Sequence, residues 1–138
     1  MTNTKKKKAP KPERKKRAKK PKYRSKFEKR IADELASYHV VFAYEGDKLP
    51  YTVPESKHVY MPDFKIGAMY IECKGLLDLE SRKKMILIKQ QYPDLDIRMV
   101  FMRNNPIRKG STTKYSDWAE QYGFKYAIGS APIEWFTE

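Results

Sequence analysis

Residues 60–75 read YMPDFKIGAMYIECKG and are the most informative part of the sequence for the fold. Within it, two β-rich runs, Phe64–Ile66 and Met69–Cys73, lie on either side of Gly67. We expect the two runs to pair as a hairpin, because a glycine between such runs is typical of a tight turn. That pairing would bring Asp63 close to the end of the second strand.

Side chains of a strand alternate between its two faces, so Glu72 and Lys74 point one way and Cys73 points the other way with Ile71. With Asp63, two carboxylates and an ammonium would then lie together at the edge of a sheet. Phosphodiester hydrolysis needs such a set. Carboxylates hold Mg²⁺, which polarises the phosphate and lowers the pKa of bound water, and a lysine orients that water. The carbonyl of Cys73 is a natural further oxygen ligand.

The same residues also have a purely structural interpretation. Asp63 would be a turn residue after Pro62, and Glu72 and Lys74 would be an exposed pair without function. Pro-Asp followed by an acid-x-Lys triplet is a loose pattern in a lysine-rich chain, so the spacing leaves the two interpretations even. Gly75 ends the strand and would leave backbone open to a phosphate, which favours the functional interpretation.

Periodicity predicts the elements around this hairpin. Apolar residues on one helical stripe predict an amphipathic helix that begins after Ser25 and runs to Tyr38. Two more helices are predicted over Leu79–Tyr92 and Ser116–Tyr122. The other predicted strands are Val40–Tyr44, Tyr51–Val53, Ile97–Met102 and Phe124–Ile128. This order predicts an α/β fold with a mixed sheet flanked by helices.

Glu28 has two possible roles. With Ser25 it forms the S-x-x-E pattern of a capping box at the start of the first helix. It also lies at the margin of the apolar stripe, where its carboxylate can reach the sheet and act as a third metal-site acid. From periodicity alone, the cap is the favoured interpretation.

The positive charge is concentrated at the start of the chain. The 138 residues include 30 Lys or Arg and 17 Asp or Glu, a formal net charge of +13. Residues 1–24 hold 13 of the basic residues and a single acid, Glu13. Residues 1–22 contain none of Val, Ile, Leu, Phe, Trp and Tyr, so they cannot bury enough apolar surface to become ordered. We therefore predict a disordered basic arm at 1–22 followed by one domain at 23–138.

A block of like charge favours a nucleic-acid partner, because neutralising phosphates releases condensed counterions. A solubilising tail and a targeting signal remain alternatives for this segment. In the polar loop 103–113, a Lys-Gly-Ser run resembles a backbone-amide phosphate site. The predicted DNA contacts are Lys5, Lys6, Lys7, Lys8, Lys15, Lys16, Arg17, Lys19, Lys20, Arg24, Lys109 and Ser111.

Several classes of protein are excluded. One cysteine, Cys73, rules out a disulfide scaffold, and with two histidines it makes a Cys/His zinc module implausible. No apolar stretch approaches the roughly 18 residues that a membrane-spanning helix requires. We therefore expect a soluble intracellular protein with no membrane partner.

Parts of residues 60–75, together with short stretches on either side of them, form an ordered series along the chain. They are YRSKFE at 23–28, LPYTVP at 49–54, YMPDF at 60–64, ECKGL at 72–76, PDLDIRMVF at 93–101, KGS at 109–111 and IEW at 133–135. Together they resemble the phage endonuclease I family of Holliday-junction resolvases. The resemblance covers the chain from Tyr23 to Trp135.

The resemblance implies a restriction-endonuclease-like PD-(D/E)xK nuclease core at 23–138. It implies catalytic roles for Glu28, Asp63, Glu72 and Lys74, and so replaces the capping-only interpretation of Glu28. The implied metal ligands are Glu28, Asp63, Glu72 and the backbone carbonyl of Cys73, holding two Mg²⁺ ions per site, with Mn²⁺ as the alternative ion. Where the family commonly has threonine, this chain has Cys73, whose side chain should face inward.

The family also implies a domain-swapped homodimer whose halves are joined by an extended bridge, here matched by 49–54. Pro50 and Pro54 stiffen this segment and should disfavour its folding back on itself. By this analogy, Glu28 would act in trans with the other site residues.

The implied function is structure-selective DNA cleavage that resolves four-way (Holliday) junctions by paired nicks. The implied location is the cytoplasm, which for a phage-encoded protein is that of the host cell. Two alternatives stay open at this point: a restriction- or repair-type nuclease on the same core, and a non-catalytic basic nucleic-acid-binding protein.

Overall fold

A computed structural model of the chain describes residues 22–53 and 56–137. The predicted DNA contacts between Lys5 and Lys20 lie outside these ranges. The elements are α1 (Lys26–Ser37), β1 (Ala43–Tyr44), β2 (Leu49–Val53), β3 (Ser56–Tyr60), β4 (Phe64–Ile66), β5 (Met69–Lys74), α2 (Leu79–Gln91), β6 (Asp96–Phe101), α3 (Tyr115–Gln121), β7 (Lys125–Ile128) and a 3₁₀ helix (Ile133–Phe136).

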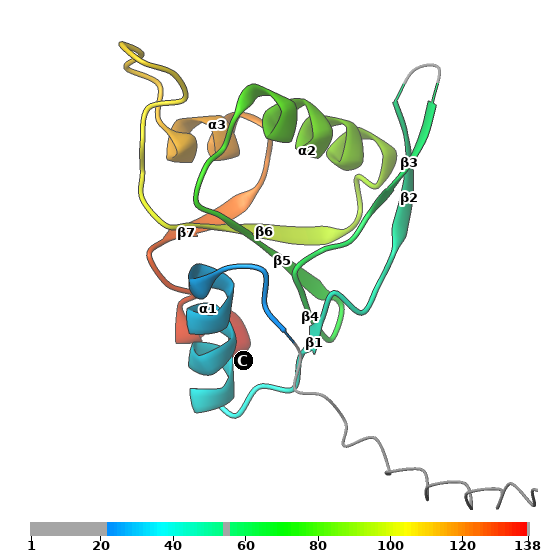
Figure 1. Cartoon of the computed structure of the whole chain (residues 1–138), viewed down its shortest axis with the longest axis vertical. Coiled ribbons are helices and arrows are strands. Elements are labelled where there is room, and N and C mark those ends of the chain that lie inside the picture. Colours follow the sequence, from blue (N-terminus) through cyan, green and yellow to red (C-terminus); the bar gives the residue numbers. More distant parts are fainter. Residues whose placement is uncertain (1–21, 54–55, 138) are drawn as a thin grey trace, which may run out of the picture.

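The central sheet has five strands in the order β1-β4-β5-β6-β7. Strand β4 is antiparallel to β1 and β5, whereas β5, β6 and β7 are parallel to one another. Helices α2 and α3 cover one face of the sheet, and α1 covers the other together with the C-terminal 3₁₀ helix (Figure 1). The predicted α/β fold with a mixed sheet flanked by helices is therefore confirmed.

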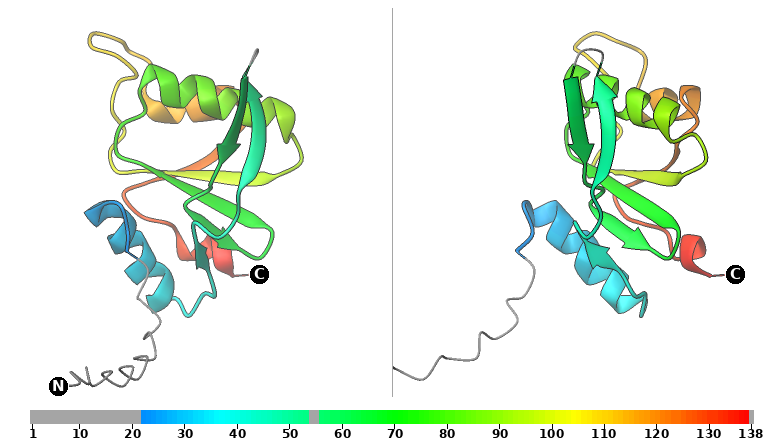
Figure 2. Two further views of the ribbon diagram at one scale, coloured as in Figure 1. Left: turned by 45° about the vertical axis from the view of Figure 1, so that its right-hand side comes forward. Right: turned by 90° about the vertical axis from the view of Figure 1, so that its right-hand side faces the viewer.

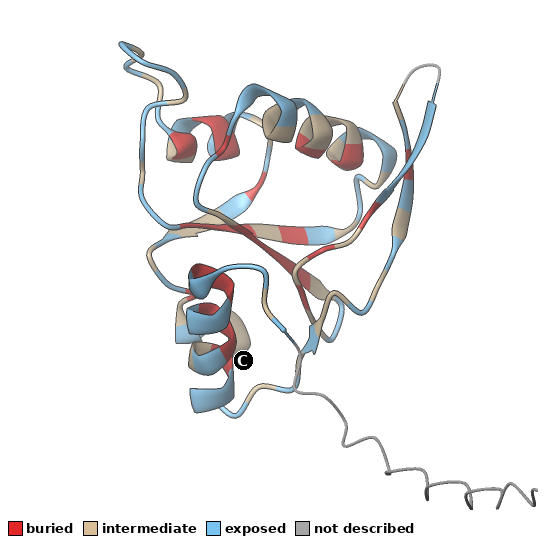
Figure 3. Cartoon of the chain, viewed as in Figure 1, coloured by how far each residue is buried: buried red, intermediate tan, exposed pale blue. Residues whose placement is uncertain are grey.

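Alternation along β5 and β6 divides the core into two parts. Ile71 and Cys73 pack with α1 on one face, whereas Tyr70 packs with α2 and α3 on the other. Met99 and Val100 of β6 divide between the two faces in the same way. Buried residues accordingly follow β5 and β6 and the helix faces turned toward the sheet (Figure 3).

Helix α1 begins as its sequence predicts. Ser25 is the N-cap, and its hydroxyl accepts a hydrogen bond from the N–H of Glu28 at 3.0 Å. Ile31 and Leu35 of the apolar stripe are fully buried against the sheet. His39, with φ of 57°, lies just past the end of the helix. Among the described residues, no helix is both long enough and apolar enough to span a membrane.

The largest difference from the prediction lies at residues 49–60. Strand β2 folds back and pairs with β3, from Leu49 opposite Tyr60 to Val53 opposite Ser56, and the hairpin leans against α2 (Figure 2). The expectation that the prolines disfavour folding back was wrong for this chain. Strand β3 was not predicted from the sequence.

Strand β2 can pair with β3 despite Pro50 because of the side to which its backbone groups point. The N–H of Thr52 donates to the side chain of Gln91 on α2 at 2.7 Å, so it points away from β3. Pro50 lies two residues earlier and faces the same outer side, where its missing N–H costs no bond to β3. Its carbonyl also points outward and accepts the hydroxyl of Tyr92.

The strand predicted over Val40–Tyr44 is also shorter than expected, because only Ala43–Tyr44 pairs with β4. The side chain of Val41 is 89% exposed, so this β-branched residue does not enter the core. Propensity for strand does not suffice where no neighbouring strand is present to pair with.

Candidate active site

The β4–β5 hairpin places the two predicted acids next to each other. Phe64 pairs with Ile71, and continuing this antiparallel register by one residue puts Asp63 opposite Glu72, as predicted. Strand β4 begins only at Phe64, so the carboxylate of Asp63, and not a backbone carbonyl of β4, accepts a hydrogen bond from β5 at this point. Its Oδ2 accepts a hydrogen bond from the N–H of Cys73 at 2.8 Å.

Glu28 reaches the same region from α1, and both of its carboxylate oxygens are held. The Ser25 hydroxyl donates to Oε2 at 2.9 Å, and the Tyr44 hydroxyl donates to Oε1 at 2.7 Å. The residue is only 8% exposed. Glu28 therefore belongs both to the cap of α1 and to the acidic cluster, so the two interpretations drawn from the sequence are compatible.

A fourth acid, Glu45, lies beside Glu28 and Asp63 and was not predicted from the sequence. Carboxylate oxygens of Glu28, Glu45 and Asp63 lie within 4.8 Å of one another. Glu45 follows the two-residue strand β1, and its φ of 49° is left-handed, an uncommon state for a residue other than glycine. Its N–H donates to the carbonyl of Asp63 at 3.0 Å, which fixes it beside that acid. No spacing or periodicity marked this residue.

Glu72 and Lys74 project from β5 on the face turned toward α2. The hydroxyl of Tyr60 donates to Oε2 of Glu72 at 2.7 Å, and Nζ of Lys74 lies 3.4 Å from Oε1. Glu72 is only 6% exposed, so these two partners hold an otherwise costly buried carboxylate. The expectation that Glu72 and Lys74 share a face, opposite to the side chain of Cys73, is confirmed.

These groups line one cavity of about 590 Å³. The four predicted residues Glu28, Asp63, Glu72 and Lys74 all contribute to it. The full lining is Arg24, Glu28, Glu45, Lys48, Val59, Met61, Asp63, Glu72, Cys73, Lys74 and Lys84.

The electrostatics of the cavity favour a bound cation. Burial, and next the negative charge of Glu72, raise the pKa of Asp63 to about 8. Burial also raises the pKa of the Cys73 thiol well above its usual value, so the sulfur remains neutral and packs under α1. A divalent cation would relieve the repulsion among the carboxylates.

The donor set fits such an ion. Its members are hard carboxylate oxygens, the ligands that Mg²⁺ and similar cations prefer. The N–H of Cys73 points toward Asp63, and in an extended strand the carbonyl of the same residue points to the same side. The Cys73 carbonyl is thus available to the cavity, and the residues present can hold a divalent metal ion.

Within one chain, α1 packs on its own sheet and brings Glu28 to its own Asp63. Action of Glu28 in trans requires a second copy of the chain and stays a prediction. Arg24 lines the cavity and pairs with Glu45 at 2.8 Å. Lys109 and Ser111 lie in the loop between β6 and α3, outside the cavity lining.

The chain is similar in sequence to known proteins over most of its length. Residues 10–138 match the family model described as phage endonuclease I. The chain is 41% identical over 118 residues to "Endonuclease I" of Escherichia phage T7, covering 84% of this chain and 79% of that protein. It is 42% identical over 113 residues to "Endodeoxyribonuclease 1" of Enterobacteria phage T3, covering 80% and 74%. On this similarity and this set of residues, the chain belongs to the phage endonuclease I family.

Proposed function

We propose that this protein is a structure-selective DNA endonuclease that resolves four-way junctions by metal-dependent phosphodiester hydrolysis. The observation that carries the proposal is the gathering of Glu28, Glu45 and Asp63 within 4.8 Å, in the cavity that Glu72 and Lys74 also line. Family membership and the names of the two relatives support cleavage of DNA as the chemistry.

In this proposal, Asp63, Glu72 and the carbonyl of Cys73 hold one metal ion, and Glu28 supports a second. Glu45 joins these ligands because of its distance from Asp63 and Glu28. Mg²⁺ is the expected ion and Mn²⁺ the alternative, since all donors are oxygens. The ions, when bound, polarise the phosphate and lower the pKa of water.

Lys74 orients the attacking water. Its ammonium is anchored by Glu72 at 3.4 Å, so it is held beside the acids rather than free in solvent. As the water oxygen bonds to phosphorus, it gives up a proton to solvent, one P–O ester bond breaks, and the leaving oxygen takes up a proton from solvent. The ammonium helps to offset the negative charge that builds up on the phosphoryl oxygens.

We further propose that the active form is a homodimer. A four-way junction has approximate two-fold symmetry, and a C2 dimer presents two equivalent sites to opposing strands. Only two residues, Pro54 and Glu55, separate β2 from β3, and short connections of this kind are prone to exchange between copies. If two copies exchanged the segments that precede Pro54, α1 of each copy would pack in the same way on the sheet of the other. Glu28 would then be supplied by the partner.

The basic arm at 1–22 is proposed to add affinity for any DNA form, and the nuclease domain at 23–138 to select the branched shape. Arg24, Lys109 and Ser111 remain proposed contacts to the DNA backbone. Contacts with phosphates fix position and orientation without reading bases, which suits selection by shape.

The test is cleavage of an immobile four-way junction with and without Mg²⁺. Asp63→Asn should abolish cutting yet leave junction binding nearly intact. The matched control is Asp33→Asn, since Asp33 is an exposed acid of α1 that pairs with Lys29 at 2.9 Å. If Asp63→Asn cuts at the parental rate, the metal site is assigned wrongly.

A second comparison tests the choice of substrate. The junction and its linear duplex arms are cut in parallel by the same preparation. Equal rates would contradict structure selection and favour a restriction- or repair-type nuclease. Binding without metal-dependent cutting would favour a non-catalytic DNA-binding protein.

A further inference from the structure

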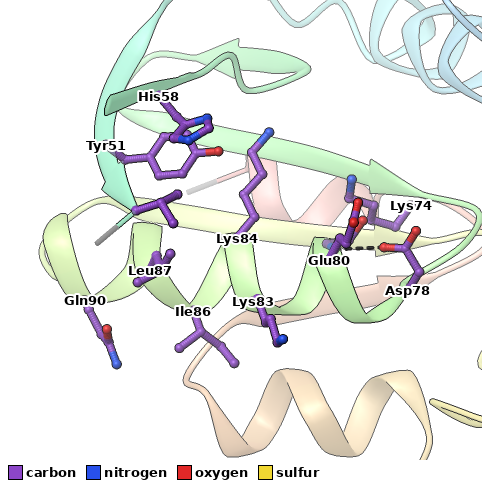
Figure 4. Close-up of a pocket in the computed structure, with 12 residues that line it drawn as sticks. Tyr51, His58, Lys74, Asp78, Glu80, Lys83, Lys84, Ile86, Leu87 and Gln90 are labelled. Atoms are coloured by element: carbon purple, nitrogen blue, oxygen red, sulfur yellow. Dashed lines mark hydrogen bonds between the residues drawn. The ribbon is translucent and has the colours of Figure 1, made fainter. Parts of the chain in front are cut away.

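Lys84 projects from α2 toward the active site but belongs to none of the groups assigned above. Its side chain extends from the helix toward the β2–β3 hairpin, past the ring of Tyr51 (Figure 4). The ammonium lies 5.1 Å from the centre of the Tyr60 ring and 5.9 Å from that of Tyr51. The two rings fix the position of this long side chain.

Lys84 stands where two cavities meet. It lines the active-site cavity and also a second cavity of about 860 Å³ between α2 and the hairpin. Lys74 is the other residue common to both linings. The second cavity is lined by the aliphatic side chains of Val53, Ile86 and Leu87 and by polar ones, which include the acids Asp78 and Glu80 near its Lys74 end and the cation Lys83. A DNA strand that ran from the active-site cavity into the second cavity would therefore pass both Lys74 and Lys84.

The charge of Lys84 is not neutralised by a salt bridge to any residue in the described part of the chain. Burial lowers its pKa, and the nearby cations Lys74 and Arg24 act in the same direction. The acids that oppose them, Glu72 and Asp63, are committed to metal in the proposed function. A partly buried ammonium in this position lacks an anion, and a phosphate supplies one.

We infer that Lys84 binds a backbone phosphate next to the scissile one, on the DNA strand that runs from the active site into the cavity between α2 and the β2–β3 hairpin. This inference rests on the proposed function. Lys84 is accordingly a substrate-binding residue that positions the strand, whereas Lys74 acts at the scissile phosphate itself.

The experiment measures binding of a four-way junction in EDTA, where no cleavage occurs. Lys84→Gln should weaken binding about tenfold to a hundredfold, the range of a hydrogen bond between charged groups. It should also reduce the slope of log K against log salt by about 0.9, or one phosphate contact. Lys84→Arg, which keeps the charge, should restore both quantities.

Lys89→Gln is the matched control. Lys89 lies on the same helix and also stacks on an aromatic ring, that of Phe124 at 5.3 Å, but it lines neither cavity. Its affinity and salt slope should equal those of the wild type. If Lys84→Gln and Lys89→Gln bind alike, Lys84 serves only the packing of the hairpin and the inference is overturned.

A second measurement covers the case in which Lys84→Gln fails to fold. In the wild type, amine acetylation followed by mass spectrometry should show Lys84 protected by the junction and Lys89 unprotected. Equal reactivity of Lys84 with and without DNA would also overturn the inference. Failure of the proposed function is seen separately, as an absence of Mg²⁺-dependent junction cutting by the wild type.

Discussion

The carboxylate of Asp63 accepts the backbone N–H of Cys73 across the edge of the sheet, at 2.8 Å. This bond joins the Pro-Asp turn to the Glu-Cys-Lys strand at the point where β4 begins. It places Asp63 opposite Glu72 and leaves the carbonyl of Cys73 facing the same side. One hydrogen bond thus aligns three of the proposed metal ligands.

The first prediction concerns stability in the absence of metal. The pKa of Asp63 is raised in the folded protein, from 3.8 to about 8, by burial and by Glu72. Folding therefore favours the protonated acid. The contribution of Asp63 to the free energy of unfolding is fully present below about pH 4 and is lost as the pH rises to about 8. Metal-free Asp63→Asn should be more stable than the wild type near pH 8, and the two should converge near pH 4. The measurement is the urea midpoint of each protein between pH 4 and pH 8, with Asp33→Asn as the control. If the midpoints of the wild type and Asp63→Asn differed by the same amount at every pH, the raised pKa of Asp63 would be contradicted.

The second prediction concerns added Mg²⁺. Because the ion requires the ionised acid, Mg²⁺ should raise the melting temperature more near pH 8 than near pH 6. Calorimetry near pH 6 should also detect proton release on binding, measured as a dependence on the ionisation enthalpy of the buffer. The metal-dependent rise should vanish in Asp63→Asn, and a rise of equal size in that variant would exclude Asp63 as a ligand.

The third prediction concerns the hydroxyls that hold Glu28. Tyr44→Phe removes the donor to Oε1 and leaves the ring packed against Tyr23 and Phe64. Groups that orient a metal ligand are typically worth about tenfold to a hundredfold in metal affinity or activity, so junction cutting should fall by that factor. Ser25→Ala should reduce the rate of junction cutting by a similar factor. It should also lower the free energy of unfolding by about 1 kcal/mol, because the N-cap of α1 is lost.

Tyr126→Phe is the control for Tyr44→Phe, because the hydroxyl of Tyr126 also donates to a glutamate, Glu120, and neither residue lines the cavity. Its cleavage rate should match the wild type. If Tyr44→Phe cuts as fast as this control, Glu28 does not need to be held in order to act.

The fourth prediction concerns the basic arm. Deleting residues 1–22 removes 12 Lys or Arg and should weaken binding to junction, duplex and single strand alike. On duplex DNA, the slope of log K against log salt should fall by about 0.9 for each phosphate that the arm no longer neutralises. Unchanged affinity at low salt would identify the arm as a tail that does not touch DNA.

The fifth prediction concerns the oligomeric state. Light scattering should report a dimer, because two sites are needed for paired nicks in the proposed function. Lengthening the connection between β2 and β3 with a flexible insert at 54–55 should increase the monomer fraction, since a longer connection favours the pairing of β2 with β3 of the same chain over pairing with the partner's β3. A purely monomeric wild type would contradict the proposed assembly.

Those features that depend on residues close together in the chain could be predicted from the sequence. Alternation along 69–74 separates Glu72 and Lys74 from Cys73, and the turn at Gly67 brings Asp63 back to them. The start of α1 at Ser25 follows from its capping pattern. Each of these is a local rule of backbone geometry, valid wherever the segment lies.

The tertiary structure alone decided the rest. Glu45 becomes part of the acidic cluster only because α1, β1 and the start of β4 converge. Lys84 reaches the site only because α2 packs on the sheet beside the β2–β3 hairpin. That hairpin closes because the missing N–H of Pro50 faces outward, a fact set by its pairing with β3 and its contact with Gln91. Contacts between distant segments depend on how whole elements pack, and no spacing within a single segment encodes them.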